Sequence, residues 1–101
     1  MSKLKKYHQD LIHRNGPTFP EYIFECPGCG SYHGLWINHP TLKGARWEWN
    51  GSLDLPTIRP SIYIEGPEGK ICHSFVTDGQ ISFLNDCTHE FKNKTLTLPD
   101  V

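Results

Sequence analysis

Apolar and polar positions alternate along this chain in short runs, the pattern of half-buried β-strands. Turn-forming residues separate the runs, which lie at 22–25, 35–37, 46–49, 61–64, 71–76, 81–84 and 95–98. The pattern predicts an all-β fold, a small β-sandwich or barrel of six to seven short strands. The sequence shows no internal repeat, so we expect residues 1–101 to form a single domain.

One β-hairpin can be placed in register from its turn. Thr77–Gln80 contains an Asp-Gly pair between two β-rich runs, which favours a two-residue type I′ turn. The first and last of these residues then face each other. Counting back along both strands puts Cys72 one diagonal step from Cys87 on one face, while His73 points to the other face.

The cysteines predict a metal site. Cys26-Pro27-Gly28-Cys29-Gly30 has the form of a zinc knuckle, in which two thiolates grip one tetrahedral ion across a tight turn. Proline presets φ for that turn, and glycine permits positive φ. A redox role for this C-x-x-C motif is disfavoured, because no βαβ pattern surrounds it.

The complete ligand set stays open at this stage. One structural Zn²⁺ is expected, because a chain this short buries little apolar surface and needs a staple. The convergence of Cys72 and Cys87 favours a four-cysteine site. A mixed set is the alternative, in which His33, His73 or His89 replaces a thiolate; the preferred ligands are Cys26, Cys29, Cys72 and Cys87, with His33 and His89 as alternates.

Composition and charge exclude several functional classes. The net charge of −1 argues against general nucleic-acid binding. No apolar run approaches the length that a membrane-spanning helix needs, and the N-terminus does not have the pattern of a secretory signal. We therefore expect a cytoplasmic protein with reduced thiols. Residues 1–16 are basic and are expected to be a loosely attached segment.

A stiff loop precedes the 61–64 strand. It runs from Trp47 to Ser61 and contains two prolines that fix φ. Trp47 and Trp49 project to the same face of their strand. Core packing is the favoured role for these two rings, and the floor of a binding pocket is the alternative.

Several segments together resemble one family. They read C-P-G-C-G-S-x-H, W-x-W-N-G-S-x-D-x-P-T-x-x-P-S-I, C-H-S-F-V-T-D-G-x-I-x-F-L-x-D-C-T-H and T-L-P-D, and cover roughly Phe24 to Asp100. The family comprises small proteins of unknown function from bacteriophages and prophages, some labelled "ammonia monooxygenase". The resemblance implies a phage origin and a zinc-binding β fold. The matching positions are Cys26, Cys29, His33, Trp49, Asn50, Gly51, Pro56, Thr57, Pro60, Ser61, Cys72, His73, Asp78, Gly79, Asp86, Cys87 and His89.

The chain departs from the family pattern after His89. An Ala-Gly turn usual in the family is replaced by Lys92-Asn93. Asn93 is expected to take the left-handed conformation that glycine would otherwise fill.

The favoured function at this stage is a phage accessory protein that binds and inhibits. It would engage a host protein or a small anionic, nucleotide-like ligand in the host cytoplasm. Trp49 would stack on the ligand, and other polar side chains would bind it. The expected binding residues are Trp49, Asn50, Arg59, Ser61, His73 and His89.

Two other functions stay open. In a zinc-dependent hydrolase, His73 or His89 would act as general base with Asp86 orienting it. The known hydrolytic zinc motifs are missing from the sequence, so we lean against an enzyme. The second alternative is a minor structural protein of the virion.

Overall fold

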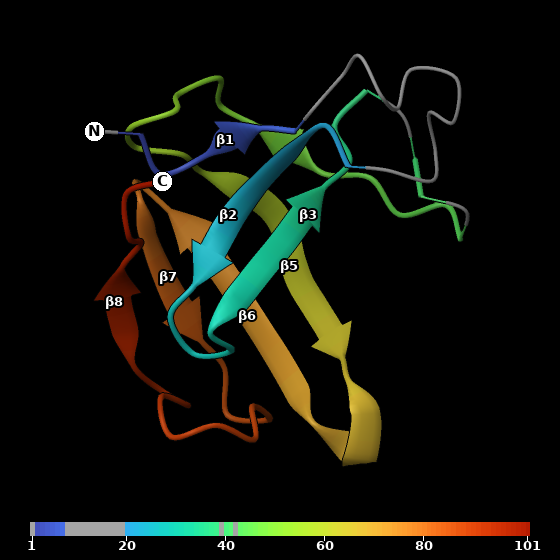
Figure 1. The fold of residues 1–101 in the computed structure, drawn as a ribbon, viewed down its shortest axis with the longest axis vertical. Helices are drawn as coiled ribbons and strands as arrows, with labels where there is room; N and C mark the ends of the chain where they lie inside the picture. The colour runs from blue at the N-terminus through green and yellow to red at the C-terminus, as the bar shows by residue number, and fades with distance from the viewer. Residues whose placement is uncertain (1, 8–19, 39, 42) are drawn as a thin grey trace.

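The computed structural model describes residues 2–7, 20–38, 40–41 and 43–101, which form two antiparallel β-sheets. The smaller sheet has the order β1-β2-β3 and the larger the order β4-β5-β6-β7-β8 (Figure 1). The predicted all-β class is confirmed. The strands are β1 (Lys5–Lys6), β2 (Tyr22–Cys26), β3 (Ser31–Leu35), β4 (Glu48–Trp49), β5 (Ile58–Glu65), β6 (Ile71–Thr77), β7 (Gln80–Phe83) and β8 (Thr95–Thr97), with a short 3₁₀ turn at Pro67–Gly69.

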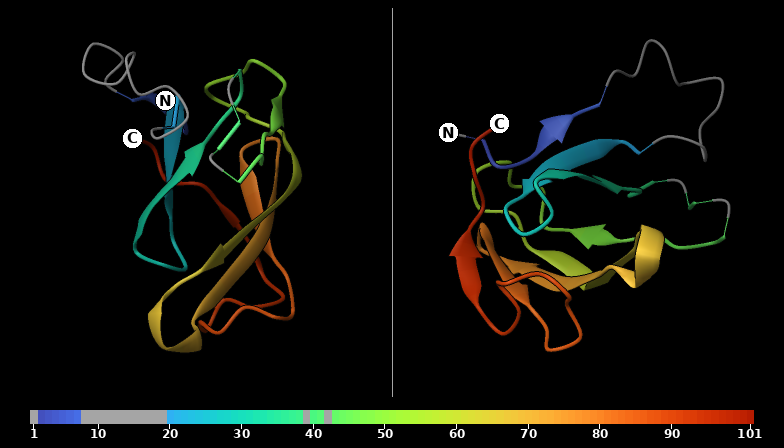
Figure 2. Two further views of the ribbon diagram at one scale, coloured as in Figure 1. Left: turned by 90° about the vertical axis from the view of Figure 1, so that its right-hand side faces the viewer. Right: turned by 60° about the horizontal axis from the view of Figure 1, so that its bottom comes forward.

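The two sheets face each other and bury the core between them (Figure 2). The smaller sheet contributes the fully buried Phe24 and Leu35. The larger sheet contributes Ile58, Ile62 and Ile81 among others. Their spacing at alternate positions on each strand follows from the two-residue period of a β-strand.

The β6–β7 hairpin has the predicted turn and register. Thr77 pairs with Gln80, and Ser74 pairs with Phe83. Asp78 and Gly79 both have positive φ, 50° and 78°, as a type I′ turn requires. Asn93 also adopts the expected left-handed conformation, with φ of 65°.

Strand β3 lies earlier in the chain than predicted. The apolar run at 35–37 suggested a strand there, but pairing with β2 covers Ser31–Leu35. Gly30, with φ of 69°, closes the knuckle turn, so pairing begins directly after it, with Cys26 opposite Ser31. The polar and small residues at the start of β3 hid this strand from the sequence pattern.

Strand β5 is longer than predicted and contains an irregularity. Ile58 pairs with Val76 and Ile62 pairs with Ser74, so three residues of β5 face one residue of β6. Such a bulge bends a strand and re-aims its side chains. Here Ile62 is buried in the core, whereas Ser61 is partly exposed on the outer face.

Part of the basic N-terminal segment is described. Lys5 and Lys6 pair with β2, and Leu4 is buried. The Lys3 ammonium lies 2.7 Å from a carboxylate oxygen of Asp100, which brings the two ends of the chain together. Residues 8–16 of the predicted loose segment lie outside the described residues.

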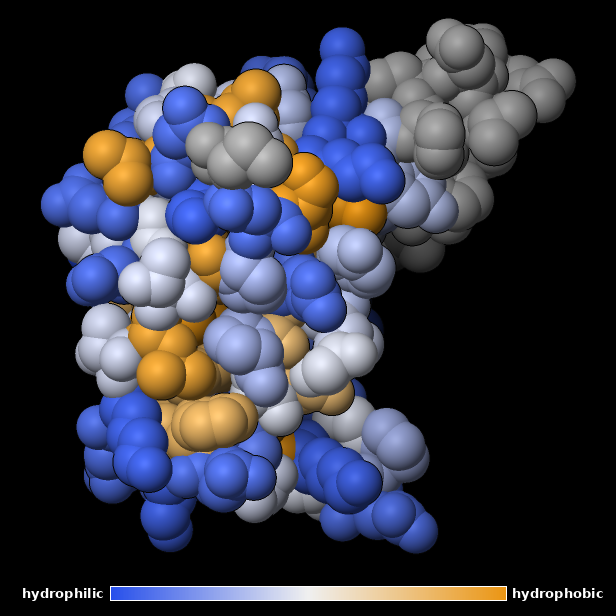
Figure 3. Space-filling model, turned by 60° about the vertical axis from the view of Figure 1, so that its left-hand side comes forward, coloured by the Kyte–Doolittle hydropathy of each residue, from blue (hydrophilic) through white to orange (hydrophobic). Residues whose placement is uncertain are grey.

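The face shown in Figure 3 carries small hydrophobic patches separated by hydrophilic side chains. Within the described parts of the chain, no helix has the length and hydrophobicity to cross a membrane.

Candidate active site and metal cluster

Strand β6 carries two groups of chemically active side chains on its opposite faces. Cys72 and Ser74 point into the core and are buried. His73 and Phe75 alternate with them and are partly exposed on the outer face.

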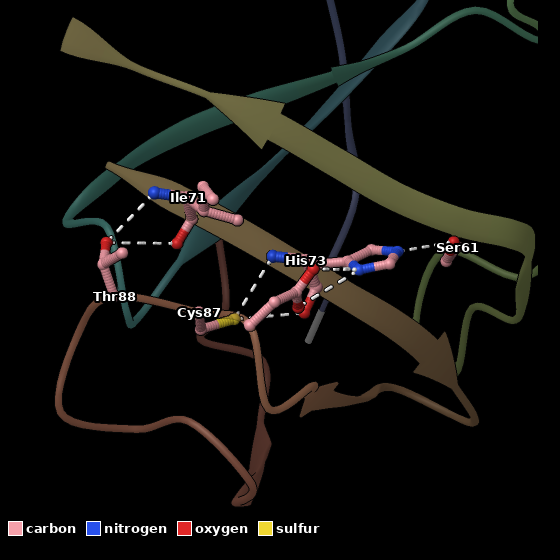
Figure 4. Close-up of polar contacts among 6 residues, drawn as sticks. Ser61, Ile71, His73, Cys87 and Thr88 are labelled. Carbon is pink, nitrogen blue, oxygen red and sulfur yellow. Dashed lines mark hydrogen bonds and ion pairs between the residues drawn. The ribbon is translucent and has the colours of Figure 1, made fainter. Parts of the chain in front are cut away.

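On the outer face, His73 lies between a hydroxyl and a carboxylate. Its Nε2 atom is 2.9 Å from Ser61 Oγ on β5 (Figure 4). Its Nδ1 atom is 2.9 Å from Asp86 Oδ2 and 3.2 Å from Asp86 Oδ1. A nucleophile, a base within hydrogen-bond reach of it and a group that orients the base define a catalytic triad. Ser61, His73 and Asp86 have this arrangement.

Asp86 is held against His73 by the segment that follows β7. The Cys87 thiol donates a hydrogen bond to the His73 carbonyl, and the His73 N–H donates to Cys87 Sγ, both at 3.2 Å. The N–H of the next residue, Thr88, donates to the Ile71 carbonyl at 3.0 Å. These bonds fix the backbone that directly follows Asp86 against β6 (Figure 4).

Ser61 and His73 are also positioned by aromatic neighbours. The Trp47 indole N–H donates to the Ser61 carbonyl at 3.3 Å. The Tyr63 ring packs edge-on against the His73 imidazole with their centroids 5.2 Å apart. The bulge, the indole and the tyrosine ring together restrict where the hydroxyl and the imidazole lie.

On the inner face, four potential metal ligands converge. Their ligand atoms all lie within 4.8 Å of one another, and they belong to Cys26, Cys29, His33 and Cys72. Cys26 Sγ and Cys72 Sγ are 3.8 Å apart. Tetrahedral zinc with Zn–S bonds of about 2.3 Å requires two sulfurs about 3.8 Å apart, so this pair fits the ion.

His33 provides independent support for a metal ion. Its side chain is only 4% exposed, and its Nε2 atom is buried with no hydrogen-bond partner among the described residues. A buried polar nitrogen without a partner is costly, and a metal ion would satisfy it. The cluster therefore has the composition of a structural metal site, with three of its four ligands buried and Cys29 exposed.

The thiols themselves are electrostatically coupled. The hydrogen bond from the Cys72 thiol lowers the pKa of Cys26 to about 4. The same bond, together with burial, raises the pKa of Cys72. Burial also raises the pKa of Cys29. Cys26 is therefore held as a thiolate, the form that binds metals.

The other predicted ligands lie beside this cluster. The ligand atoms of Cys87 and His89 lie within 4.8 Å of each other and of Cys72 Sγ. A Cβ atom on Gly28 would come within 2.5 Å of the His89 ring, so the ring lies directly on the knuckle. His89 Nε2 is buried without a partner among the described residues. The cysteines are all free thiols.

The predicted binding residues do not all come together. Ser61 and His73 are in contact. The Trp49 indole instead donates to the Ser52 carbonyl, and its ring packs on Tyr22.

Asn50 and Arg59 also have partners elsewhere. Asn50 hydrogen-bonds within its own loop, to Leu55 and Ser52. The Arg59 guanidinium donates to the carbonyls of Ile58 and Val76.

The sequence interpretation did not assign Ser61 as a nucleophile. It paired His73 with Asp86 but treated Ser61 as a ligand contact. The signal that would have found it is the β5–β6 register, which puts Ser61 diagonally across from His73 on one face.

A family model described as "Bacterial ubiquitination-like system serine protease (BubE)" matches residues 3–84. The chain therefore belongs to this family. Neither the curated proteins nor the solved structures contain a significant match.

This family membership corrects the favoured functional prediction. A phage accessory module that binds and inhibits conflicts with a family described as serine proteases, so that prediction was wrong. The comparisons also give no support to a phage origin or to a virion role. The same description argues against the alternative of a zinc-dependent hydrolase that uses His73 or His89, because it specifies a serine protease.

Proposed function

From this family membership we propose that the protein is a serine protease whose catalytic triad is Ser61, His73 and Asp86. The observation that carries the proposal is the pair of contacts made by one imidazole, 2.9 Å to the Ser61 hydroxyl and 2.9 Å to the Asp86 carboxylate. These are the contacts that a general base needs on its two nitrogens.

The three residues divide the steps of the reaction between them. His73 Nε2 takes the proton from Ser61 Oγ as that oxygen attacks the carbonyl carbon of the substrate. Asp86 accepts a hydrogen bond from the Nδ1–H of His73, which fixes the tautomer and stabilises the imidazolium while the carboxylate stays ionised. His73 then gives its proton to the leaving amine, which departs and leaves an acyl group on Ser61. Water, activated by the same imidazole, releases the acyl group and restores the hydroxyl.

We propose that the inner cluster is a structural zinc site whose ligands are Cys26, Cys29, Cys72 and His33. When bound, a zinc ion with four protein ligands crosslinks strands without taking part in proton transfer. The grouping of the four ligand atoms within 4.8 Å and the unpartnered His33 Nε2 support this set. Cys87 already exchanges two hydrogen bonds with the His73 backbone, which gives it a different role.

The two sites are linked through the chain. Cys72 precedes His73 directly, and Asp86 precedes Cys87 directly. A metal held between the knuckle and Cys72 would fix β6 against the smaller sheet. The cluster would thereby hold the position of the imidazole on the opposite face of the same strand.

The family description also indicates the kind of substrate. We propose a polypeptide of a ubiquitin-like conjugation system, cleaved at a peptide or isopeptide bond. Four unpaired thiols suit a reducing compartment, so we place the reaction in the cytoplasm. The earlier expectation of a host-protein or anionic partner stays a prediction.

The experiment is covalent labelling with a fluorophosphonate, which reacts with activated serines and needs no knowledge of the substrate. We expect the purified protein to be labelled at a rate that Ser61→Ala abolishes and His73→Ala lowers by at least about 10³-fold. Ser82→Ala is the matched control, because Ser82 lies on β7 in the same sheet and hydrogen-bonds to Thr95 at 2.9 Å. Labelling that survives Ser61→Ala would contradict the proposal.

A further inference from the structure

Strand β5 has a free edge next to the proposed nucleophile. It pairs with β6 along its length, but on its other side β4 pairs only with Ile58 and Arg59. Among the described residues, no strand pairs with β5 on that side from Ser61 to Glu65, and the Ser61 carbonyl there accepts the hydrogen bond from the Trp47 indole. Figure 2 (left) shows this edge facing the viewer, with β6 behind it.

The direction of the backbone groups on this edge follows from the register. Gly66 N–H donates to the Lys70 carbonyl, so this pair is hydrogen-bonded. In an antiparallel ladder hydrogen-bonded and non-hydrogen-bonded pairs alternate. Tyr63 and Glu65 therefore form non-hydrogen-bonded pairs with β6, and their N–H and C=O groups point away from it.

Partners on the opposite side of β6 support this assignment. The backbone carbonyl of His73, which pairs with Tyr63, accepts a hydrogen bond from the Leu84 N–H at 2.9 Å. The backbone carbonyl of Ile71, which pairs with Glu65, accepts a hydrogen bond from the Thr88 N–H at 3.0 Å. Both residues direct their backbone groups away from β5, as the alternation requires.

A groove runs beside this free edge. It has a volume of about 670 Å³ and opens onto the metal cluster, because its lining includes Ser31 and Tyr32 of β3, Ile64 and Gly66, and also Cys29, His33 and Cys72. Tyr32 is 54% exposed and Tyr63 is 49% exposed. Tyr32 lines the groove, whereas Tyr63 lies on the other face of β5 beside His73, so the free edge has an exposed tyrosine on each side.

We propose that the substrate binds as an extended segment that adds a strand to the free edge of β5. Its main chain hydrogen-bonds to Tyr63 and Glu65, which brings its scissile carbonyl to Ser61 two residues away. Strand addition of this kind recognises main chain and so requires an unfolded stretch of polypeptide. The substrate class is therefore a flexible tail or linker. This inference rests on the proposed protease function.

The test uses a proline scan of the free edge. Proline removes an N–H group and is tolerated where that group points out of the sheet. Glu65→Pro therefore removes one proposed substrate bond and keeps the β5–β6 ladder, whereas Glu65→Ala keeps the N–H group and is the matched control. Replacing the Glu65 amide by an ester in the chemically synthesised chain removes the same N–H if the proline variant does not fold.

The probe is a library of denatured peptides from a digested bacterial proteome, with cleavage followed by mass spectrometry. We expect the wild-type protein to cleave library peptides. For the peptide cleaved fastest, Glu65→Pro should lower kcat/KM by about tenfold, the effect of one lost hydrogen bond and a displaced strand. Glu65→Ala should have no such effect. Fluorophosphonate labelling of Ser61 should proceed at the same rate in all three proteins.

Two outcomes would overturn the inference while leaving the protease function in place. One is Ser61 labelling without cleavage of any library peptide. The other is kcat/KM unchanged in both the proline and the ester variants. Failure of Ser61 to be labelled would instead remove the proposed function, and the inference with it.

Discussion

The two faces of β6 show how one strand can serve two different purposes. The outer face carries His73 in a partly exposed set of hydrogen bonds, with 23% of its side-chain surface accessible. The inner face carries Cys72, which is buried against the thiol of Cys26. Adjacent residues therefore belong to sites with different physical demands, one for proton transfer and one for cohesion of the fold.

This difference predicts which property each substitution will change. Altering a triad residue lowers the activity of the protein but removes few core contacts. Altering a residue of the inner cluster lowers the stability of the protein, because the cluster joins the knuckle of the smaller sheet to the larger sheet. Substitutions on the two faces of β6 and in the turns beside them should therefore separate loss of activity from loss of stability.

Asp86→Asn should lower the rate of Ser61 acylation by about 10⁴-fold, because asparagine favours the wrong tautomer of His73. The melting temperature should stay close to that of the wild type, since Asp86 is exposed. Stopped-flow labelling with the fluorophosphonate measures the rate. Asp78→Asn, in the exposed hairpin turn, is the control and should label at the wild-type rate. A loss of less than about tenfold would contradict the orienting role.

Cys26→Ser should remove the bound metal and lower the free energy of unfolding by at least about 3 kcal/mol, because metal binding energy contributes directly to folding. Elemental analysis and urea denaturation measure the two effects. Cys87→Ser is the matched control, because a serine hydroxyl can still bond to the His73 backbone. Loss of metal from Cys87→Ser would show that the fourth ligand is Cys87 and not His33.

Gly28→Ala should destabilise the protein by about 1–3 kcal/mol, because its Cβ would lie 2.5 Å from the His89 ring and force the ring or the knuckle to move. Gly66→Ala offers a comparison, since its Cβ would meet its nearest neighbour at an ordinary 3.8 Å. Thermal unfolding of both variants checks the difference. Equal melting temperatures would show that His89 does not pack on the knuckle as described.

Gly79→Ala should have the smallest effect, a loss of about 1–2 kcal/mol. Gly79 has φ of 78°, a conformation that disfavours a side chain. The labelling rate per folded molecule should not change, because the turn lies at the far end of the hairpin from His73. A Cβ on Gly79 would also lie 3.2 Å from the Asp54 carbonyl oxygen and 3.3 Å from the Leu55 side chain. Gly51→Ala, with φ of 86° and open space around its Cβ, should therefore lose less stability in urea denaturation. A larger loss in Gly51→Ala would contradict the contribution of the contacts around Gly79.

Elements specified by a short local motif could be predicted from the sequence, and elements without one could not. The β6–β7 hairpin was predicted correctly because Asp78-Gly79 specifies both the turn and the register. Strand β3 was misplaced, since Ser31 and Gly34 interrupt the apolar pattern that marks a strand.

The candidate triad needed information that the sequence does not carry locally. His73 and Asp86 sit on one hairpin, so their proximity could be foreseen. Ser61 reaches them only through the pairing of β5 with β6 and the bulge before Ile62. The loop after β5 contains Pro67 and a 3₁₀ turn, which specify no register.

His33 illustrates the same limit in the metal cluster. It faces Phe24 across the β2–β3 ladder and is buried, and this follows once β3 begins at Ser31. With the strand expected later, the alternation of its side chains was unknown. The histidine therefore entered only as an alternate to a cysteine.

The most direct test of the account is peptide mapping of the fluorophosphonate adduct by tandem mass spectrometry. The triad predicts a single modified residue, Ser61, in protein that retains its metal. An adduct on any other serine, or no adduct in folded and metal-loaded protein, would contradict the assignment of Ser61, His73 and Asp86 as the catalytic triad.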